Sequence, residues 1–313
     1  MSEKAKVLTI QSAITDEIFY ALGLKHRGFL RQTLGWLFAL PTWKFSRYMA
    51  TVDSALVEGG APAGCQVMMD AINIDIHAMG VGNIPASGPT LLLANHPGAY
   101  DSVAIGSLVP RPDLKVVATG TRFYNVLPNV RPQILAVSKK PEENMVTLRN
   151  AIDHLQQGGV LLQFGSGRVE PDPATDPVGE DVFAKWSSSL EILLRKVKGL
   201  QVIPTITSGV LLKRFRDSIL ARVRKEDVDR RRLAEFFQVI QQLVFPNSVD
   251  GKAMISFGDP FQLDDLEAES EGRRLMPAAI SRVQQTLMDH LAWISGSGES
   301  DAPGASCRAE SAE

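Results

Sequence analysis

Short apolar runs recur along the middle of the chain and predict the strands of a sheet. Residues 90–94 read Thr-Leu-Leu-Leu-Ala between Gly88-Pro89 and Asn95-His96-Pro97, which is typical of a strand buried on both faces of a mainly parallel sheet. Residues 72–76 alternate between apolar and polar side chains and favour a half-exposed edge strand. The expected strands are residues 72–76, 90–94, 115–119, 133–138, 159–164, 201–206 and 252–257.

Amphipathic segments separate these runs and predict helices, because their apolar residues recur three and four positions apart. The clearest lies near the end of the chain, where Ile280, Val283, Leu287, Leu291 and Ile294 share one helical face. The expected helices are residues 9–24, 29–58, 97–108, 142–157, 180–198 and 208–245, with a last helix over residues 280–294.

This order of elements predicts an α/β fold, with a mixed, mainly parallel sheet flanked by helices and an N-terminal helical extension. We divide the chain into an N-terminal helical segment over residues 1–70 and an α/β domain over residues 71–295. Residues 296–313 are rich in Gly, Ser, Ala and Glu, so we expect a disordered tail there.

The composition is that of a folded protein, with 313 residues, 44% hydrophobic and 22% charged, and a net charge of −2. This charge gives no general reason to expect a nucleic-acid partner. The first residues lack the layout of a secretory signal, and no apolar stretch approaches the roughly 18 residues of a membrane span. Cys65, Cys307 and the isolated histidines other than His96 show no metal-ligand spacing, so we expect no metal and no cofactor.

Residues 95–101 read Asn-His-Pro-Gly-Ala-Tyr-Asp and carry the strongest chemical signal in the chain. Inside one helix His96 and Asp101 would lie about 140° apart and would not meet. Proline is preferred at the first helical position, so we predict a helix that begins at Pro97, with His96 in the turn before it. The Asp101 carboxylate would then reach the imidazole, fix its tautomer and leave His96 to take a proton from a hydroxyl. A helix-capping histidine is the simpler interpretation of an isolated match.

Three further segments accompany this turn: residues 158–168 (Gly-Gly-Val-Leu-Leu-Gln-Phe-Gly-Ser-Gly-Arg), residues 202–205 (Val-Ile-Pro-Thr) and residues 257–261 (Phe-Gly-Asp-Pro-Phe). Together with residues 82–101, and in the same order, they resemble the motifs of the glycerolipid acyltransferases. This family includes the glycerol-3-phosphate and lysophosphatidate acyltransferases. The likeness covers roughly residues 80–265, and the agreement in order is more specific than any single motif.

The third of the family's motifs is altered in this chain. The family's strand ends in Phe-Pro-Glu-Gly-Thr-Arg, whereas Gly165-Ser166-Gly167-Arg168 follows Phe164 here. The segment is closer to the Ser-Gly-Gly-Arg-Asp-Arg-Pro version of soluble plastid-type glycerol-3-phosphate acyltransferases. Whether Glu170 substitutes for the motif's Glu stays open, and the departure bears on the acceptor rather than on the reaction class.

The resemblance implies an O-acyltransferase of phospholipid synthesis, which moves a fatty acyl group from an acyl thioester to a hydroxyl of a glycerol phosphate or lysophosphatidate. Acyl-CoA or acyl carrier protein would be the co-substrate. His96 would be the general base, oriented by Asp101, and amides at the start of the predicted helix would stabilise the oxyanion. Arg168 would be the main phosphate ligand, because its planar fork matches a phosphate. The other substrate-binding residues we expect are Gly167, Ser166, Lys139 and Arg122.

Residues 29–48 bear on the location of such an enzyme. They concentrate aromatic and apolar side chains, Trp36 and Trp43 among them, between Arg and Lys residues. This composition suits a bilayer interface, and it suits equally a helix that packs on its own domain. A lipid substrate tips the balance toward a cytoplasmic protein that is peripheral on the cytoplasmic membrane face.

The chain has one basic and one acidic stretch toward its C-terminal end. The basic excess from Lys213 to Arg232 fits anionic lipid or an acyl carrier protein, or simply a solvated helix face. The acidic stretch from Asp259 to Glu271 is interpreted as a surface loop.

Three alternatives to this function remain open. They are transfer to a different lysolipid or to an amino-lipid hydroxyl, thioester hydrolysis by water, and lipid binding without turnover on the same fold.

Overall fold

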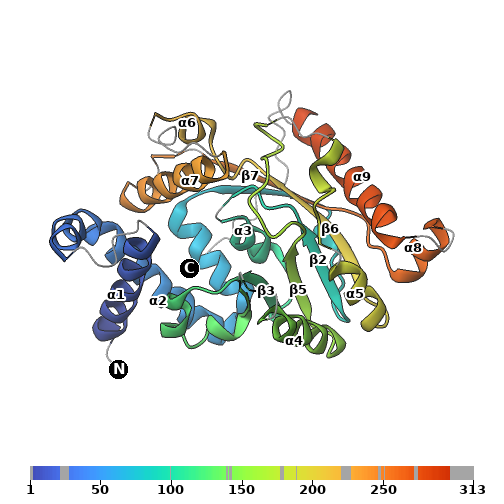
Figure 1. Ribbon diagram of the computed structural model, residues 1–313, viewed down its shortest axis with the longest axis horizontal. Coiled ribbons are helices and arrows are strands. Elements are labelled where there is room, and N and C mark those ends of the chain that lie inside the picture. Colours follow the sequence, from blue (N-terminus) through green and yellow to red (C-terminus); the bar gives the residue numbers. More distant parts are fainter. Residues whose placement is uncertain are drawn as a thin grey trace, which may run out of the picture.

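The computed structural model describes residues 3–21, 28–98, 100–138, 140, 143–176, 180–187, 189–219, 227–245, 248–249, 251–270 and 274–296. The chain has an α/β fold in which a mixed, mainly parallel sheet is flanked by helices (Figure 1), as predicted. Within the described residues the sheet has seven strands in the order β1-β7-β6-β2-β5-β3-β4. Neighbouring strands pair in parallel except β6 and β7, which are antiparallel. The strands are β1 (Asp75–Met79), β2 (Thr90–Ala94), β3 (Leu114–Thr119), β4 (Ile134–Val137), β5 (Val160–Phe164), β6 (Gln201–Ser208) and β7 (Lys252–Phe257).

The central strand β2 occupies the predicted residues 90–94, and all of its side chains are buried. Successive side chains of a strand point to opposite faces. Leu91 and Leu93 therefore pack in one apolar cluster and Leu92 and Ala94 in another. Ala94 is paired in register with Phe164, the last residue of β5. The two parallel strands end level, and the segments that follow them start from the same edge of the sheet.

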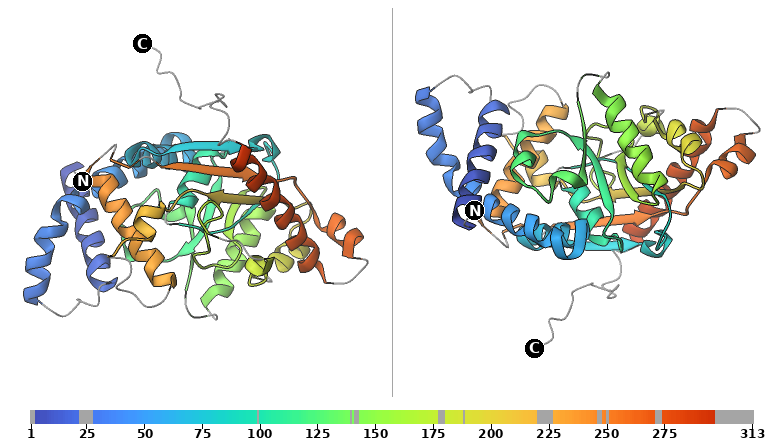
Figure 2. Two further views of the ribbon diagram at one scale, coloured as in Figure 1. Left: turned by 90° about the horizontal axis from the view of Figure 1, so that it is seen from above. Right: turned by 90° about the horizontal axis from the view of Figure 1, so that it is seen from below.

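Helices cover both faces of the sheet (Figures 1 and 2). The first cluster joins β2, β5 and β6 to α4, α5, α8 and α9, whereas the second joins the sheet to the end of α2 and to α3. The last helix, α9, confirms the predicted amphipathic segment over residues 280–294. The α-helices are α1 (Glu3–Ala21), α2 (Gly28–Ile72), α3 (Asp101–Leu108), α4 (Asn144–Gln156), α5 (Ser189–Lys196), α6 (Lys213–Arg216), α7 (Asp227–Val244), α8 (Leu263–Ser270) and α9 (Leu275–Gly296).

The N-terminal helices are longer than predicted. α1 starts at Glu3 rather than at residue 9, and α2 continues to Ile72 rather than ending at residue 58; residues 22–27 lie outside the described part. α2 has one non-helical residue, Gly60, with a φ of 67°, and the backbone of Pro112 lies against it. Because α2 continues to residue 72, the edge strand β1 begins at Asp75 rather than at residue 72.

A buried carboxylate attaches these helices to the rest of the molecule. Asp53 of α2 is fully buried and pairs with Lys6 of α1 at 3.0 Å. It also accepts the backbone N–H groups of Asn129 at 2.8 Å and Val130 at 3.1 Å. Among the helices that the structure describes, none combines the length and the apolarity needed to cross a bilayer.

The predicted helix over residues 208–245 is wrong in its first part. Gly209 follows β6 with a φ of 75°, and its amide donates to the Asp172 carboxylate at 3.0 Å. Leu212 is extended, so the helical conformation starts only with the short α6, and α7 is a separate helix. The predicted helix over residues 180–198 is also divided, into the 3-10 helix Glu180–Phe183 and α5.

The acidic stretch 259–271 is not a surface loop, because most of it forms α8. Asp264 and Asp265 lie in the first turn of this helix, where negative charge is favourable. Asp265 also accepts the N–H of Gln262 at 2.7 Å. Glu269 forms an ion pair with Arg282 of α9. Of the predicted tail, all but Gly296 lies outside the described residues.

Candidate active site

The turn after β2 brings His96 and Asp101 together. The Nδ1 of His96 lies 2.7 Å from Oδ2 of Asp101, which is the first residue of α3 and is fully buried. Asp101 also accepts the N–H of Gly98 at 3.2 Å and the N–H of Ser102 at 2.6 Å. An ionised carboxylate only accepts hydrogen bonds, so Nδ1 carries the proton and Nε2 keeps its lone pair. The predicted contact is present.

The start of the helix differs from the prediction. α3 begins at Asp101 rather than at Pro97, with Tyr100 as its N-cap residue. Within the turn before the helix, the Gly98 amide donates to the Asp101 carboxylate. The amides of Val103 and Ala104 donate to the Tyr100 carbonyl oxygen. The amides of Gly98, Ser102, Val103 and Ala104 are therefore engaged within the turn, and oxyanion stabilisation by other amides at this helix start stays a prediction.

The imidazole of His96 packs on an aromatic ring and remains partly exposed. It stacks on Phe164 with ring centroids 4.3 Å apart and an interplanar angle of 19°. Its side chain is 26% exposed. Burial by itself lowers the pKa of His96. The charge and hydrogen bond of Asp101 act in the opposite direction, as do the charges of Glu235 and Glu170. The net result is a pKa above the ordinary value of histidine. These carboxylates make His96 a stronger base than a free histidine.

Glu170 holds the backbone of His96 from the neighbouring segment. Its Oε2 accepts the His96 N–H at 3.1 Å, and its own N–H donates to the His96 carbonyl oxygen at 2.7 Å. Its Oε1 accepts the indole N–H of Trp186 at 2.8 Å. Burial raises the pKa of Glu170. The sequence left the part of Glu170 open, and in the structure it fixes the turn that carries the base.

The glycine-rich turn after β5 lies beside the His96 turn. A Cβ at Gly165 would lie 2.0 Å from Trp186, so only glycine fits there. Ser166 donates to the carbonyl oxygen of Arg168 at 3.0 Å and accepts its N–H at 3.2 Å, and Gly167 has a φ of 63°. Arg168 is exposed.

The side chains of the other two predicted substrate ligands lie outside the described residues. Lys139 lies outside the described residues. Arg122 begins the 3-10 helix Arg122–Val126, but its side chain lies outside the described part. Within the described residues, Ser166, Gly167 and Arg168 therefore form the candidate binding turn.

A network of carboxylates and arginines fastens the segment after this turn to α6 and α7. Asp172 is buried and accepts the N–H groups of Gly209 and Ala174. Arg231 pairs with Asp176 at 2.6 Å, and Arg216 pairs with the same carboxylate. Both arginines belong to the basic stretch 213–232, so part of that stretch stabilises the fold rather than facing solvent.

Two side chains of α7 reach the His96 turn, and sequence reasoning missed both. Gln238 donates to the Tyr100 hydroxyl at 3.3 Å and to the Val210 carbonyl oxygen at 2.8 Å. Glu235 is 8% exposed, and burial, followed by the charge of Asp101, raises its pKa to about 8. Nothing local in the sequence marks these positions, because only tertiary packing brings α7 to this edge of the sheet.

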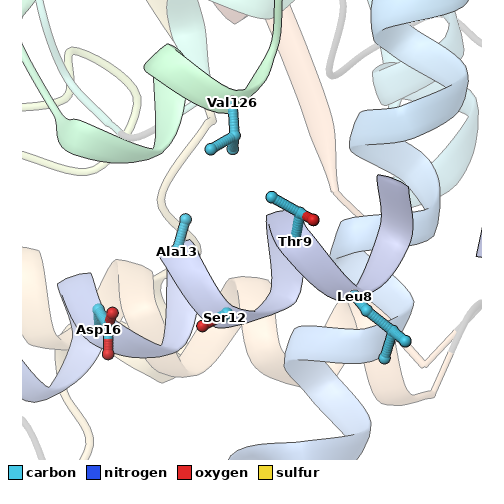
Figure 3. Close-up of a pocket in the computed structure, with 6 residues that line it drawn as sticks. All are labelled: Leu8, Thr9, Ser12, Ala13, Asp16 and Val126. Carbon is cyan, nitrogen blue, oxygen red and sulfur yellow. The ribbon is translucent and has the colours of Figure 1, made fainter. Parts of the chain in front are cut away.

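One hollow of the described chain lies apart from this site. A shallow hollow of about 500 Å³ between α1 and Val126 is lined by Leu8, Thr9, Ser12, Ala13 and Asp16 (Figure 3). None of these residues belongs to the His96 turn. Among the described residues, no three His, Cys, Asp or Glu side chains are grouped in a way that would hold a metal ion.

Comparison with protein-family models and with curated proteins finds no match. Among solved structures, the chain is similar to the 1-acyl-sn-glycerophosphate (LPA) acyltransferase PlsC from Thermotoga maritima, at 14% sequence identity. The alignment covers 94% of this chain and 98% of that chain, with a TM-score of 0.44. A likeness at this level does not bear on the activity of this chain.

Proposed function

We propose that the protein is an O-acyltransferase that moves a fatty acyl group from an acyl thioester to a hydroxyl of a glycerol phosphate or lysophosphatidate acceptor. One observation carries the proposal: at the carboxyl end of the central strand, a partly exposed histidine is held through Nδ1 by a buried aspartate. Open α/β sheets bind their ligands at this end. The order of the motifs along the chain supports the choice of reaction.

In the proposed reaction Nε2 of His96 takes the proton of the acceptor hydroxyl while the hydroxyl oxygen attacks the thioester carbonyl carbon. Asp101 keeps the proton on Nδ1 and stabilises the imidazolium that forms. The tetrahedral intermediate then collapses, the carbon–sulfur bond breaks, and the thiolate takes the proton back from Nε2. The transfer is direct and leaves no acyl group on the protein.

We further propose that the acceptor's phosphate binds at the turn after β5. Arg168 is exposed there and follows a strand that ends level with β2. Its guanidinium would hold the phosphate in a bidentate, charge-assisted contact. Lys139 and Arg122 remain proposed co-ligands, and the acyl donor would be acyl-CoA or acyl carrier protein.

An enzyme that acts on such acyl chains is expected at a membrane surface. Helix α2 has exposed apolar side chains suited to membrane contact. Trp36 is 82% exposed, and Leu37, Leu40 and Trp43 are also exposed on the same helix. The guanidinium of Arg47 lies 5.0 Å from the ring centroid of Trp43. Tryptophan with a neighbouring cation suits the headgroup region of an anionic bilayer. We propose that this face docks the protein on the cytoplasmic side of the membrane.

Release of thiol from an acyl thioester tests the reaction class. The assay is run on the full chain with acyl-CoA, and in parallel with an acyl carrier protein donor. It is run without acceptor and with glycerol-3-phosphate, lysophosphatidate or an amino-lysolipid. Release that requires one of the phosphate acceptors is the expected result. Thiol release at the same rate with and without acceptor would mean hydrolysis by water. No release with any pair of donor and acceptor would mean a lipid-binding protein.

A further inference from the structure

Glu235 is a buried carboxyl group that the proposed reaction does not yet use. It lies on α7 and is 8% exposed. Its Oε1 has no hydrogen-bond partner among the described residues. A buried polar oxygen without a partner is unfavourable and rare in folded proteins. Such an atom is expected either to be a site of strain or to await a ligand group.

The position of Glu235 favours a ligand. A Cβ built on Gly98 would lie 3.9 Å from Oε1 of Glu235 and 2.8 Å from Cγ2 of Val210. The missing side chain at Gly98 thus lets α7 and the segment after β6 approach the backbone between His96 and Asp101. The carboxyl group lies over the turn that holds the base.

The burial of Glu235 and its charged neighbours together favour its protonated form. Its charged neighbours across the packing interface are Asp101 and His96, and on its own helix they are Arg232 and Arg231. The Tyr100 phenol also faces it. Burial, followed by the Asp101 carboxylate, raises the pKa of Glu235 to about 8, although His96, Arg232 and Arg231 act in the opposite direction. The group is therefore mainly a carboxylic acid, which can donate a hydrogen bond.

The proposed reaction needs such a donor, because the thioester carbonyl oxygen becomes negatively charged. The amides of Gly98, Ser102, Val103 and Ala104 donate within the turn. We propose that Glu235, in its protonated form, donates a hydrogen bond to the acyl carbonyl oxygen and stabilises the oxyanion. This inference rests on the acyl transfer proposed above.

In this step Glu235 keeps its proton. The acceptor oxygen bonds to the carbonyl carbon, its proton passes to Nε2 of His96, and the carbonyl π electrons move to the oxygen that Glu235 contacts. On collapse these electrons restore the carbonyl bond, and the thiolate leaves with the proton from His96. A neutral buried acid suits this part, whereas an ionised Glu235 would repel the oxyanion.

The test uses the full chain, acyl-CoA and whichever acceptor the wild-type protein requires. Glu235→Leu should lower kcat by about 10²–10³-fold, as loss of one oxyanion donor does, with little change in the KM for acyl-CoA. Glu235→Gln keeps a donor that does not titrate, so its kcat should stay within about tenfold of wild type. Asp229→Leu, an exposed carboxylate on the same helix, is the matched control and should not change kcat.

The pH dependence supplies a second measurement that does not need the Leu variant to fold. Wild-type kcat should fall as pH rises through the pKa of about 8, because the acid form is the active one. In Glu235→Gln this decline should disappear. The inference is overturned if the Gln variant keeps the alkaline decline, if Gln is as inactive as Leu, or if a folded Leu variant turns over like wild type. A wild-type protein without acceptor-dependent release would instead count against the proposed function itself.

Discussion

The His96 turn and the Arg168 turn follow neighbouring strands that end level, yet the chain holds them very differently. At the His96 turn, Asp101 and Glu170 are buried and fix both the imidazole and the backbone. In the turn after β5, Gly167 and Arg168 are exposed, and Ser166 bonds the backbone of Arg168. The protein therefore orders the group proposed for proton transfer in advance, and leaves the group proposed for acceptor binding to be ordered by its ligand.

The largest effect should come from removing the proposed base. His96→Ala should lower kcat by about 10²–10⁴-fold, the usual contribution of general-base catalysis. Its fold should survive, because the residue lies in a turn and its side chain is partly exposed. The assay is thiol release, with His77→Ala on the edge strand β1 as the histidine control. A folded His96→Ala protein with near-normal turnover would remove His96 from the mechanism.

Loss of the Glu170 contact should cost somewhat less. Glu170→Ala leaves the His96 N–H and the Trp186 indole without their acceptor, so the imidazole is held less firmly. A small displacement of a catalytic group can cost about 10²-fold, and we expect a fall of that order in kcat with KM nearly unchanged. Glu170→Gln retains an amide oxygen as acceptor and should recover part of the loss. Equal activity of the Ala variant and wild type would show that the hydrogen bonds of Glu170 to His96 and Trp186 contribute only to stability.

At the exposed turn the change should appear in KM rather than in kcat. Arg168→Lys keeps the charge but loses the planar fork, so the KM for a phosphate acceptor should rise, and Arg168→Ala should raise it further. The KM for the acyl donor should stay as it is, and Arg149→Ala on α4 serves as the exposed arginine control. If the KM values for donor and acceptor rise together, or if only the stability of the protein falls, the acceptor need carry no phosphate.

The smallest effect on chemistry should come from the exposed face of α2. Changing Trp36 and Trp43 together to Ser should weaken binding to anionic vesicles by tenfold or more, since about 1.5–3 kcal/mol accompanies burial of each large apolar side chain. Turnover of a water-soluble acceptor should be unchanged. The matched control is Met145→Ser with Val146→Ser, two exposed apolar residues of α4. Unaltered vesicle flotation of the Trp variant would mean that this face does not meet the membrane.

The sequence was most informative where the signal was local. The buried run 90–94, an edge strand predicted at 72–76 and found at 75–79, and the contact of His96 with Asp101 all follow from short-range patterns. The predicted start of α3 at Pro97 was wrong. The Asp101 carboxylate accepts a hydrogen bond from the Gly98 amide, and the helix begins only at Asp101. Glu235 and Trp186 could not be assigned to the site, because α7 and the segment after the glycine-rich turn reach His96 only through tertiary packing.

The acid side of the pH–rate profile tests the central claim most directly. His96 must be neutral to take a proton, and its pKa is raised above the ordinary value by Asp101 and the neighbouring carboxylates. Wild-type kcat/KM should therefore be lost as pH falls through a value above about 6.5. In Asp101→Asn, burial should dominate and the loss should move to lower pH, with a lower maximum. An acid limb at the same pH in both proteins would contradict a His96 base held by Asp101.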